Sequence, residues 1–241
     1  MIIIVLLIII LSIISFDSFI FEKCNKFKNL QHHKSNKPKV VILGSIHGNE
    51  PAGSHAIIKL NQLIKQKKII LKRGNLVLLP FFNSCGNTLN LRNFPSLSNS
   101  VDLNRSFYSK KSNFKMIEKL KKIVTNADMV LDLHEGWGYN TSDRRSLGSG
   151  IYPNRPRLNN LCQHLKRKLN NNIHNKKKYF VTKPLPKEMA NQKSLSNYCL
   201  NKNINHILIE TTGHNDIQPL SLRINQNLNV FMNLFKNMKI I

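Results

Sequence analysis

Residues 39–64 read KVVILGSIHGNEPAGSHAIIKLNQLI, and this stretch predicts a strand, a polar loop and a helix. The apolar residues 40–43 are typical of a strand that is buried on both faces. Pro51 suits the first turn of a helix, and the apolar residues between Ala56 and Ile64 recur with a helical period. A short apolar strand followed by an amphipathic helix is the building unit of α/β proteins.

The same alternation of apolar strands and amphipathic helices continues to the end of the chain. The pattern predicts further strands at 76–79, 129–133 and 206–210, and helices at 114–124, 158–169, 194–200 and 220–238. Residues 83–112 are rich in Asn and Ser and predict a long irregular region. We therefore expect a three-layer α/β fold, with a mixed, mostly parallel sheet and helices on both faces.

The N-terminal segment has the composition of a membrane-targeting sequence. Residues 2–16 are almost entirely apolar, and Asp17 is the single charged residue among the first 21. No basic residue precedes this run and six lysines follow it between positions 23 and 39, which favours an uncleaved anchor over a cleaved signal. We expect residues 1–21 to be this membrane segment, with residues 2–21 in contact with the bilayer. Residues 22–37 would then be a polar linker, and residues 38–241 a catalytic domain.

The basic flank of the N-terminal segment predicts that the catalytic domain is cytoplasmic, by the positive-inside rule. Cleavage of the segment as a signal peptide would make the domain secreted instead. Both locations stay open at the level of sequence.

The chain is strongly basic, with a formal net charge of +25 over 241 residues. Its lysines are scattered along the sequence, whereas nucleic-acid surfaces cluster Lys and Arg with exposed aromatic residues. Nucleic acid is therefore not the expected partner. The four cysteines show no Cys-x-x-Cys spacing, which argues against a cysteine zinc site and suggests reduced thiols or packing residues.

Four polar clusters carry the candidate chemistry: residues 47–50 (HGNE), 102–105 (DLNR) and 132–135 (DLHE), and Glu210. Ligands of open α/β sheets gather at the carboxyl ends of strands, so His47, His134 and Glu210 are expected to converge. Two histidines and one glutamate match the ligand set of a hydrolytic zinc ion, which keeps one position open for water. A second carboxylate is then available as a base.

Each cluster is a weak signal by itself. His47 could be a loop histidine with local hydrogen bonds, His134 a strand-end histidine, and Glu210 a cap of a helix or turn. The Asp-Leu-Asn-Arg string is rarer, and chance does not readily place all four clusters in one chain.

The four clusters, in this order, resemble the motifs of the zinc carboxypeptidase superfamily, in particular its branch of aspartoacylase and succinylglutamate desuccinylase. The resemblance spans about residues 39–236 and implies the fold of that superfamily. It also implies one Zn²⁺ per chain, bound by His47, Glu50 and His134. Glu210 would be the general base, and the substrate carboxylate would be held by Asn104 and Arg105.

Two further roles follow from the resemblance. Arg92 is similar to the arginine that polarises the scissile carbonyl, and Asp102 to the carboxylate that orients the first zinc histidine. Asp132 shares the strand face of His134, whereas Glu135 points to the other face and is expected at a pocket rim or in solvent.

The sequence thus predicts an enzyme, a zinc-dependent hydrolase that cleaves an amide or ester bond of a small carboxylate-bearing substrate. Deacylation of an N-acyl amino acid is the first expectation. A zinc carboxypeptidase acting at a peptide C-terminus, or a peptidoglycan-type amidase, would use the same site. A non-catalytic, membrane-tethered binding module is the alternative from a different class.

Overall fold

The computed structural model describes residues 26–95, 100–108, 115–185, 193–213 and 217–241. The predicted membrane segment, residues 1–21, lies outside these ranges, so the anchor stays a prediction from sequence. Within the described ranges, no helix combines the length and the apolar character that crossing a bilayer requires.

The described strands form one seven-stranded sheet in the order β1-β3-β2-β4-β7-β5-β6. Their bounds are β1 Leu30–His33, β2 Lys39–Gly44, β3 Asn75–Leu79, β4 Met129–Gly136, β5 Gly150–Pro153, β6 Val181–Thr182 and β7 His206–Thr212. The central strands β3, β2, β4 and β7 are parallel to one another, while β1 and β5 run antiparallel to their inner neighbours. The sheet is therefore mixed and mostly parallel, as the sequence predicts.

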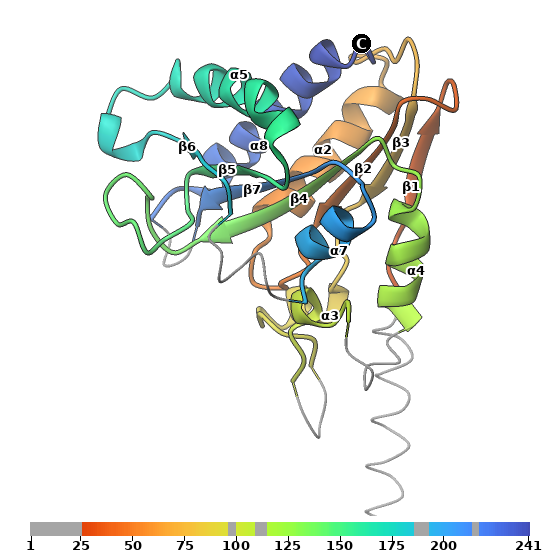
Figure 1. The fold of residues 1–241 in the computed structure, drawn as a ribbon, viewed down its shortest axis with the longest axis horizontal. Helices are drawn as coiled ribbons and strands as arrows, with labels where there is room; N and C mark the ends of the chain where they lie inside the picture. The colour runs from red at the N-terminus through yellow and green to blue at the C-terminus, as the bar shows by residue number, and fades with distance from the viewer. Residues whose placement is uncertain (1–25, 96–99, 109–114, 186–192, 214–216) are drawn as a thin grey trace, which may run out of the picture.

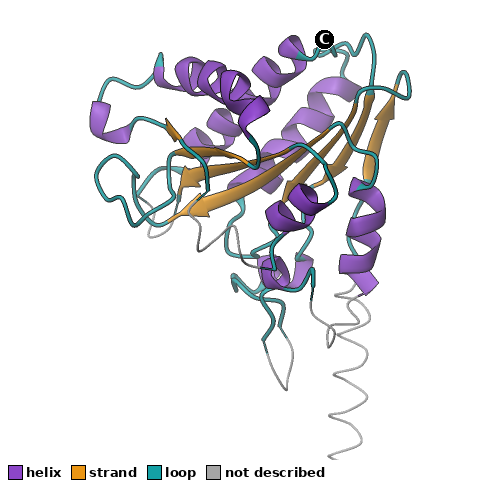
Figure 2. Ribbon diagram, in the orientation of Figure 1, coloured by secondary structure: helices purple, strands orange, loops and turns teal. Residues whose placement is uncertain are grey.

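Helices cover both faces of this sheet (Figures 1 and 2). One face carries α2 (Ala52–Lys65), α5 (Asn159–Asn170) and α8 (Leu220–Asn237), and the other carries α4 (Lys115–Val124) and α7 (Leu195–Asn201). Alternate strand residues enter different cores. Val40 packs in the cluster that includes Phe231 of α8, and Val41 in the cluster that includes Leu120 of α4. The three-layer α/β fold is confirmed.

The structure differs from the prediction at the edges of the sheet. Residues 22–37 are predicted to be a linker, but Leu30–His33 within them forms β1, paired with β3. The short edge strands β5 and β6 are absent from the prediction, and so is helix α3 (Ser84–Thr88) in the irregular region. An edge strand depends on backbone hydrogen bonds to its neighbour, and these leave little trace in composition.

The cysteines also divide into two kinds. Cys162 and Cys199 are buried free thiols, and burial raises the pKa of Cys162 to about 12. These two are packing residues, as expected. Cys85 is disulfide-bonded, so the expectation of a reduced thiol is wrong at that position.

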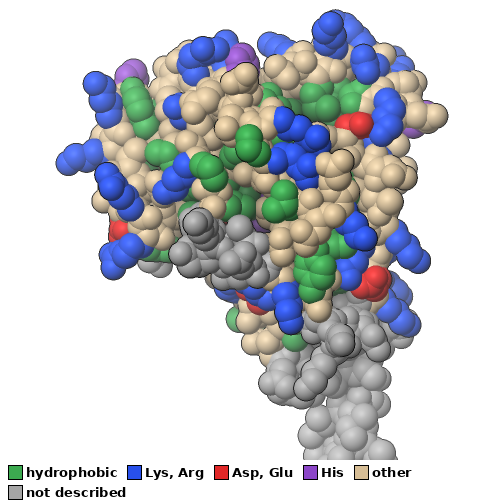
Figure 3. Space-filling model, viewed as in Figure 1, with side chains coloured by type: hydrophobic (Ala, Val, Ile, Leu, Met, Phe, Trp, Pro, Cys, Tyr) green, Lys and Arg blue, Asp and Glu red, His purple; other side chains and the backbone are tan. Residues whose placement is uncertain are grey.

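Basic side chains lie dispersed over the face of the molecule seen in Figure 3. This face carries Lys and Arg over several elements and does not gather them in a single groove. The dispersion matches the scatter of lysine along the sequence.

Candidate metal centre

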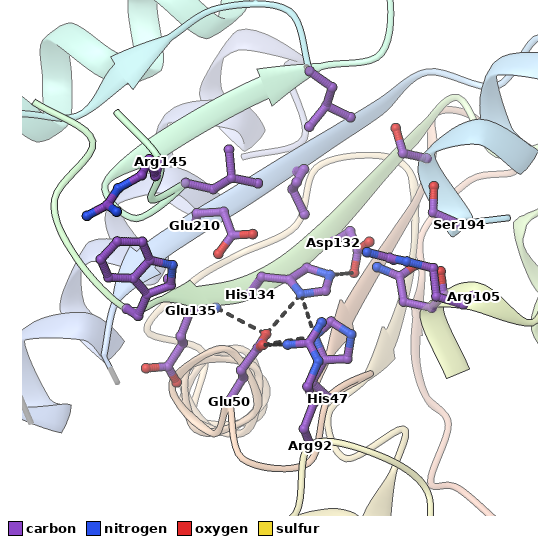
Figure 4. A pocket seen from close by; sticks show the side chains of 17 residues that line it. His47, Glu50, Arg92, Arg105, Asp132, His134, Glu135, Arg145, Ser194 and Glu210 are labelled. Carbon is purple, nitrogen blue, oxygen red and sulfur yellow. Dashed lines mark hydrogen bonds and ion pairs between the residues drawn. The ribbon is translucent and has the colours of Figure 1, made fainter. Parts of the chain in front are cut away.

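Three neighbouring parallel strands deliver the candidate site residues to one end of the sheet. His47 and Glu50 lie in the loop between β2 and α2, and His134 lies on β4. Glu210 on β7 is the direct neighbour of His134 in the register of the two strands. Figure 4 shows these side chains around one cavity. Residues separated by up to 163 positions thus meet because their strands are adjacent and parallel.

His47, Glu50 and His134 converge on one point and are all buried. Nδ1 of His47 lies 2.8 Å from Oε1 of Glu50, and Nδ1 of His134 lies 2.9 Å from Oε2 of the same carboxylate. The two Nδ1 atoms are 3.1 Å apart. One ligand atom from each of the three residues falls within 4.8 Å of the others, the compactness that a shared metal ion needs.

Two aspartates hold the far nitrogens of these histidines. Nε2 of His47 lies 3.2 Å from Oδ1 of Asp102, and Nε2 of His134 lies 3.1 Å from Oδ1 of Asp132. A carboxylate at Nε2 keeps the proton on that nitrogen and leaves the Nδ1 lone pair directed at the centre. Two lone pairs and one carboxylate then face one another, and a cation between them satisfies all three. Two His and one carboxylate are donors that zinc accepts, so these residues fit a zinc ion.

Electrostatics support the same fit. Burial opposes a positive charge on His134, but the carboxylates of Asp132 and Glu50 raise the pKa of its imidazole well above the usual value. Burial likewise opposes ionisation of Asp102, yet the hydrogen bond and charge of His47, with Arg92 nearby, lower its pKa to about 2. The centre therefore attracts positive charge, and a proton and a metal ion compete for it.

Glu210 borders the same cavity, which has a volume of about 230 Å³. Only 8% of Glu210 is exposed, and burial raises the pKa of its carboxyl to about 8. His134 and Arg92 oppose this shift, whereas Glu50 and Asp132 add to it. A carboxyl that exchanges its proton near neutral pH, close to a metal centre, is suited to act as a general base.

Arg92, Asn104 and Arg105 also line the cavity. The Arg92 guanidinium donates to Oε1 of Glu50 at 3.1 Å, and its Nη2 lies 3.5 Å from Oδ2 of Asp102. Arg105 donates to the backbone oxygen of Asn104 at 3.1 Å. Thus all eight residues singled out in the sequence lie at this cavity or contact a residue that does.

The sequence-based interpretation of Glu135 is wrong where it places this residue in solvent. Glu135 is buried, accepts a hydrogen bond of 2.6 Å from the Ala52 N–H at the start of α2, and forms an ion pair with Arg223 of α8. Its own backbone N–H donates to Oε2 of Glu50 at 3.1 Å. Glu135 therefore joins α2, β4 and α8 directly behind the metal centre.

Sequence reasoning also overlooked Arg223 and two residues at the cavity mouth, Trp137 and Arg145. The Arg145 guanidinium lies 5.8 Å from the centre of the Trp137 ring. One signal for Arg223 was present, because an arginine on the inward face of an amphipathic helix requires a buried acidic partner.

Comparison with known proteins places this geometry in a family. Residues 36–171, more than half of the chain, match the succinylglutamate desuccinylase/aspartoacylase catalytic domain. The fold and the centre are of the zinc carboxypeptidase type. The chain belongs to the succinylglutamate desuccinylase/aspartoacylase family.

Individual relatives are more distant. Over 120 residues, the chain is 31% identical to carboxypeptidase E of Caenorhabditis elegans, a match that covers 43% of this chain and a quarter (25%) of that protein. The tripeptide-bound structure of the cell shape determinant Csd4 from Helicobacter pylori superposes with a TM-score of 0.74 at 19% identity, covering 90% of this chain and 56% of that one.

The succinylglutamate desuccinylase/aspartoacylase structure from Rhodobacter sphaeroides superposes with a TM-score of 0.63 at 17% identity. The alignment covers 89% of this chain and 59% of that one. At these identities the solved structures show the fold, and the chain spans little more than half of their length.

Proposed function

We propose that this protein is a zinc-dependent hydrolase that cleaves an amide bond of a small carboxylate-bearing substrate, such as an N-acyl amino acid. The observation that carries the proposal is the convergence of His47, Glu50 and His134 beside Glu210 and Arg105 in one cavity. Membership of the desuccinylase/aspartoacylase family supports it.

A zinc ion held by the three ligands would lower the pKa of bound water toward about 7 and polarise the substrate carbonyl. Glu210 borders the cavity from the neighbouring strand and accepts the proton of the attacking water. The same carboxyl then returns this proton to the leaving amine nitrogen. Burial suits both steps, because it raises the pKa of Glu210 to about 8.

Arginine side chains would orient the substrate. The planar fork of Arg105 can bind the substrate carboxylate through two parallel hydrogen bonds, and Asn104 lies beside it in the cavity wall. Arg92 adds positive charge near the carbonyl oxygen that becomes negative during attack. Asp102 keeps His47 in the tautomer that presents Nδ1 to the metal.

A carboxypeptidase or peptidoglycan-type amidase is the second candidate, and one feature favours it. A second cavity of about 200 Å³ adjoins the first and shares Leu185 and Ser196 with it. A short N-acyl amino acid would leave this space unused, whereas a peptide would extend into it. Csd4, described as a D,L-carboxypeptidase and solved with a bound tripeptide, has the same fold.

The first test measures zinc per chain by elemental mass spectrometry on the purified protein. We expect about one zinc in the wild type and little in the double variant His47→Ala/His134→Ala. His55→Ala is the matched control, because His55 is exposed on α2 and contributes nothing to the cluster. A folded wild type that binds no zinc would overturn the hydrolase proposal and favour a non-catalytic binding module.

Hydrolysis is then measured on two substrate sets, N-acyl amino acids and short peptides with a free C-terminus. Faster turnover of the acyl amino acids supports the deacylase, and faster turnover of the peptides supports the second candidate. Esters of the same acids separate amide from ester preference.

The location of the protein is a separate proposal. Residues 2–21 would tether the chain to a membrane. The disulfide at Cys85 favours an oxidising compartment, and hence the alternative in which the catalytic domain lies outside the cytoplasm.

A further inference from the structure

A second histidine of the β4–β7 pair, His206, lies behind the metal centre. It is the first residue of β7, has no exposed surface, and is not among the described residues that line the cavity. The proposed mechanism gives it no role. A fully buried histidine in the central sheet needs a polar partner, and the identity of that partner points to a function.

The strand register puts His206 on the same side of the sheet as the site. In the parallel pair of β4 and β7, Val130 is opposite His206 and His134 is opposite Glu210. Because strand side chains alternate between faces, His206 shares a face with Glu210, and Asp132 shares that face with His134. His206 and Asp132 are thus diagonal neighbours, one step further from the cavity.

Asp132 bridges the two histidines. Its Oδ1 lies 3.1 Å from Nε2 of His134, and its Oδ2 lies 3.4 Å from Nε2 of His206. Burial opposes ionisation of this aspartate, but both histidines lower its pKa well below the usual range. Each carboxylate oxygen therefore has its own imidazole, and this fixes the rotation of the carboxylate.

The other nitrogen of His206 limits how the ring can be protonated. Its Nδ1 is buried and has no hydrogen-bond partner among the described residues. A proton placed there would be buried without an acceptor, which is costly, so the ring carries its proton on Nε2 and donates to Asp132.

Building on the proposed zinc site, we propose that His206 is a positioning residue for the metal centre. It holds the Asp132 carboxylate in the rotation that directs Oδ1 at His134, and so keeps the Nδ1 lone pair of His134 aimed at the metal. His206 acts through Asp132 and touches neither substrate nor metal. Outer carboxylates of this kind change metal affinity by about 10- to 100-fold in other proteins.

The test measures the zinc dissociation constant by competition with a chelator at constant pH, so it does not depend on activity. We expect His206→Phe, which keeps a ring but has no N–H, to weaken zinc binding by about tenfold. His206→Gln retains an N–H donor and should stay within about threefold of the wild type. Ile207→Ala is the matched control: it removes a fully buried side chain next to His206 on the opposite face, and should lower stability without changing zinc affinity.

A double-mutant cycle separates positioning from general loosening. If His206 works through Asp132, then His206→Phe should add almost nothing to the loss of affinity already caused by Asp132→Asn. Additive losses, an unchanged zinc affinity in His206→Phe, or an equal loss in Ile207→Ala would each overturn the inference. Should His206→Phe not fold, the His206→Gln arm of the same cycle decides, and additive effects there overturn the inference as well. A wild type that binds no zinc refutes the proposed function itself, which distinguishes the two failures.

Discussion

Arg223 offers a quantitative test of how the C-terminal helix supports the metal centre. Its guanidinium pairs with Glu135 inside the protein, where the side chains are 6% and 1% exposed. Arg223→Met keeps the aliphatic stem but leaves the Glu135 carboxylate buried with the Ala52 N–H as its remaining described donor. Removal of one partner of a buried pair costs about 3–5 kcal/mol. Stability totals only about 5–15 kcal/mol in typical domains, so this loss is large.

The loss should depend on pH. Burial raises the pKa of Glu135 above its usual value even in the wild type, although the Ala52 N–H and Arg223 oppose the shift. Without Arg223 the folded-state pKa rises further, so between the unfolded and folded pKa values the native state binds more protons than the unfolded state. The free energy of unfolding then falls as pH rises through that window. Arg223→Met should therefore be less destabilised at pH 5 than at pH 8.

The assay is urea unfolding of the purified protein at both pH values, with a thermal scan beside it. At pH 8 the melting temperature should fall by roughly 6–20 °C, taking about 2–4 °C per kcal/mol for a domain of this size. The double variant Glu135→Gln/Arg223→Met removes the unpaired charge and should recover part of the loss. Lys236→Met is the control, because Lys236 is exposed on the same helix.

Two results would refute the reasoning. One is an Arg223→Met protein within about 1 kcal/mol of the wild type at pH 8, since the buried ion pair would then contribute little. The other is a double variant no more stable than Arg223→Met alone, since the unpaired carboxylate would then not be the cause.

Three further predictions concern the site and the N-terminal segment. Glu210→Gln should lower kcat by about 10²–10⁴ while zinc content stays at the wild-type level, and near-normal turnover would contradict the general-base role. Arg105→Lys should raise KM for carboxylate substrates by about tenfold without changing zinc affinity, because Lys cannot form the two parallel hydrogen bonds; an unchanged KM would place the carboxylate elsewhere. Deletion of residues 1–21 should move the protein from the membrane pellet to the supernatant after cell fractionation, and a full-length chain already in the supernatant would show that the segment does not anchor it.

Much of the fold was predictable because each element has a local physical signature. Residues 40–43 and 129–133 are continuous apolar runs, as strands buried between two helical layers must be. The final helix shows an apolar face at a helical period, and the structure has it as α8, Leu220–Asn237. Strand β1 was missed, since its residues Leu-Gln-His-His carry no such pattern and pairing with β3 stabilises them.

The candidate site divides in the same way. The sequence by itself determined which residues carry the chemistry, because the spacing of His47 and Glu50, the Asp102–Arg105 string and the strand-end positions of His134 and Glu210 are local properties of the chain. Only the tertiary structure decided which side chains stand behind them. Glu135 with Arg223, and Asp132 with His206, are partners because β4 packs beside β7 and against α2, and burial of their charges makes the pairing necessary. No local pattern encodes a contact between positions 88 residues apart.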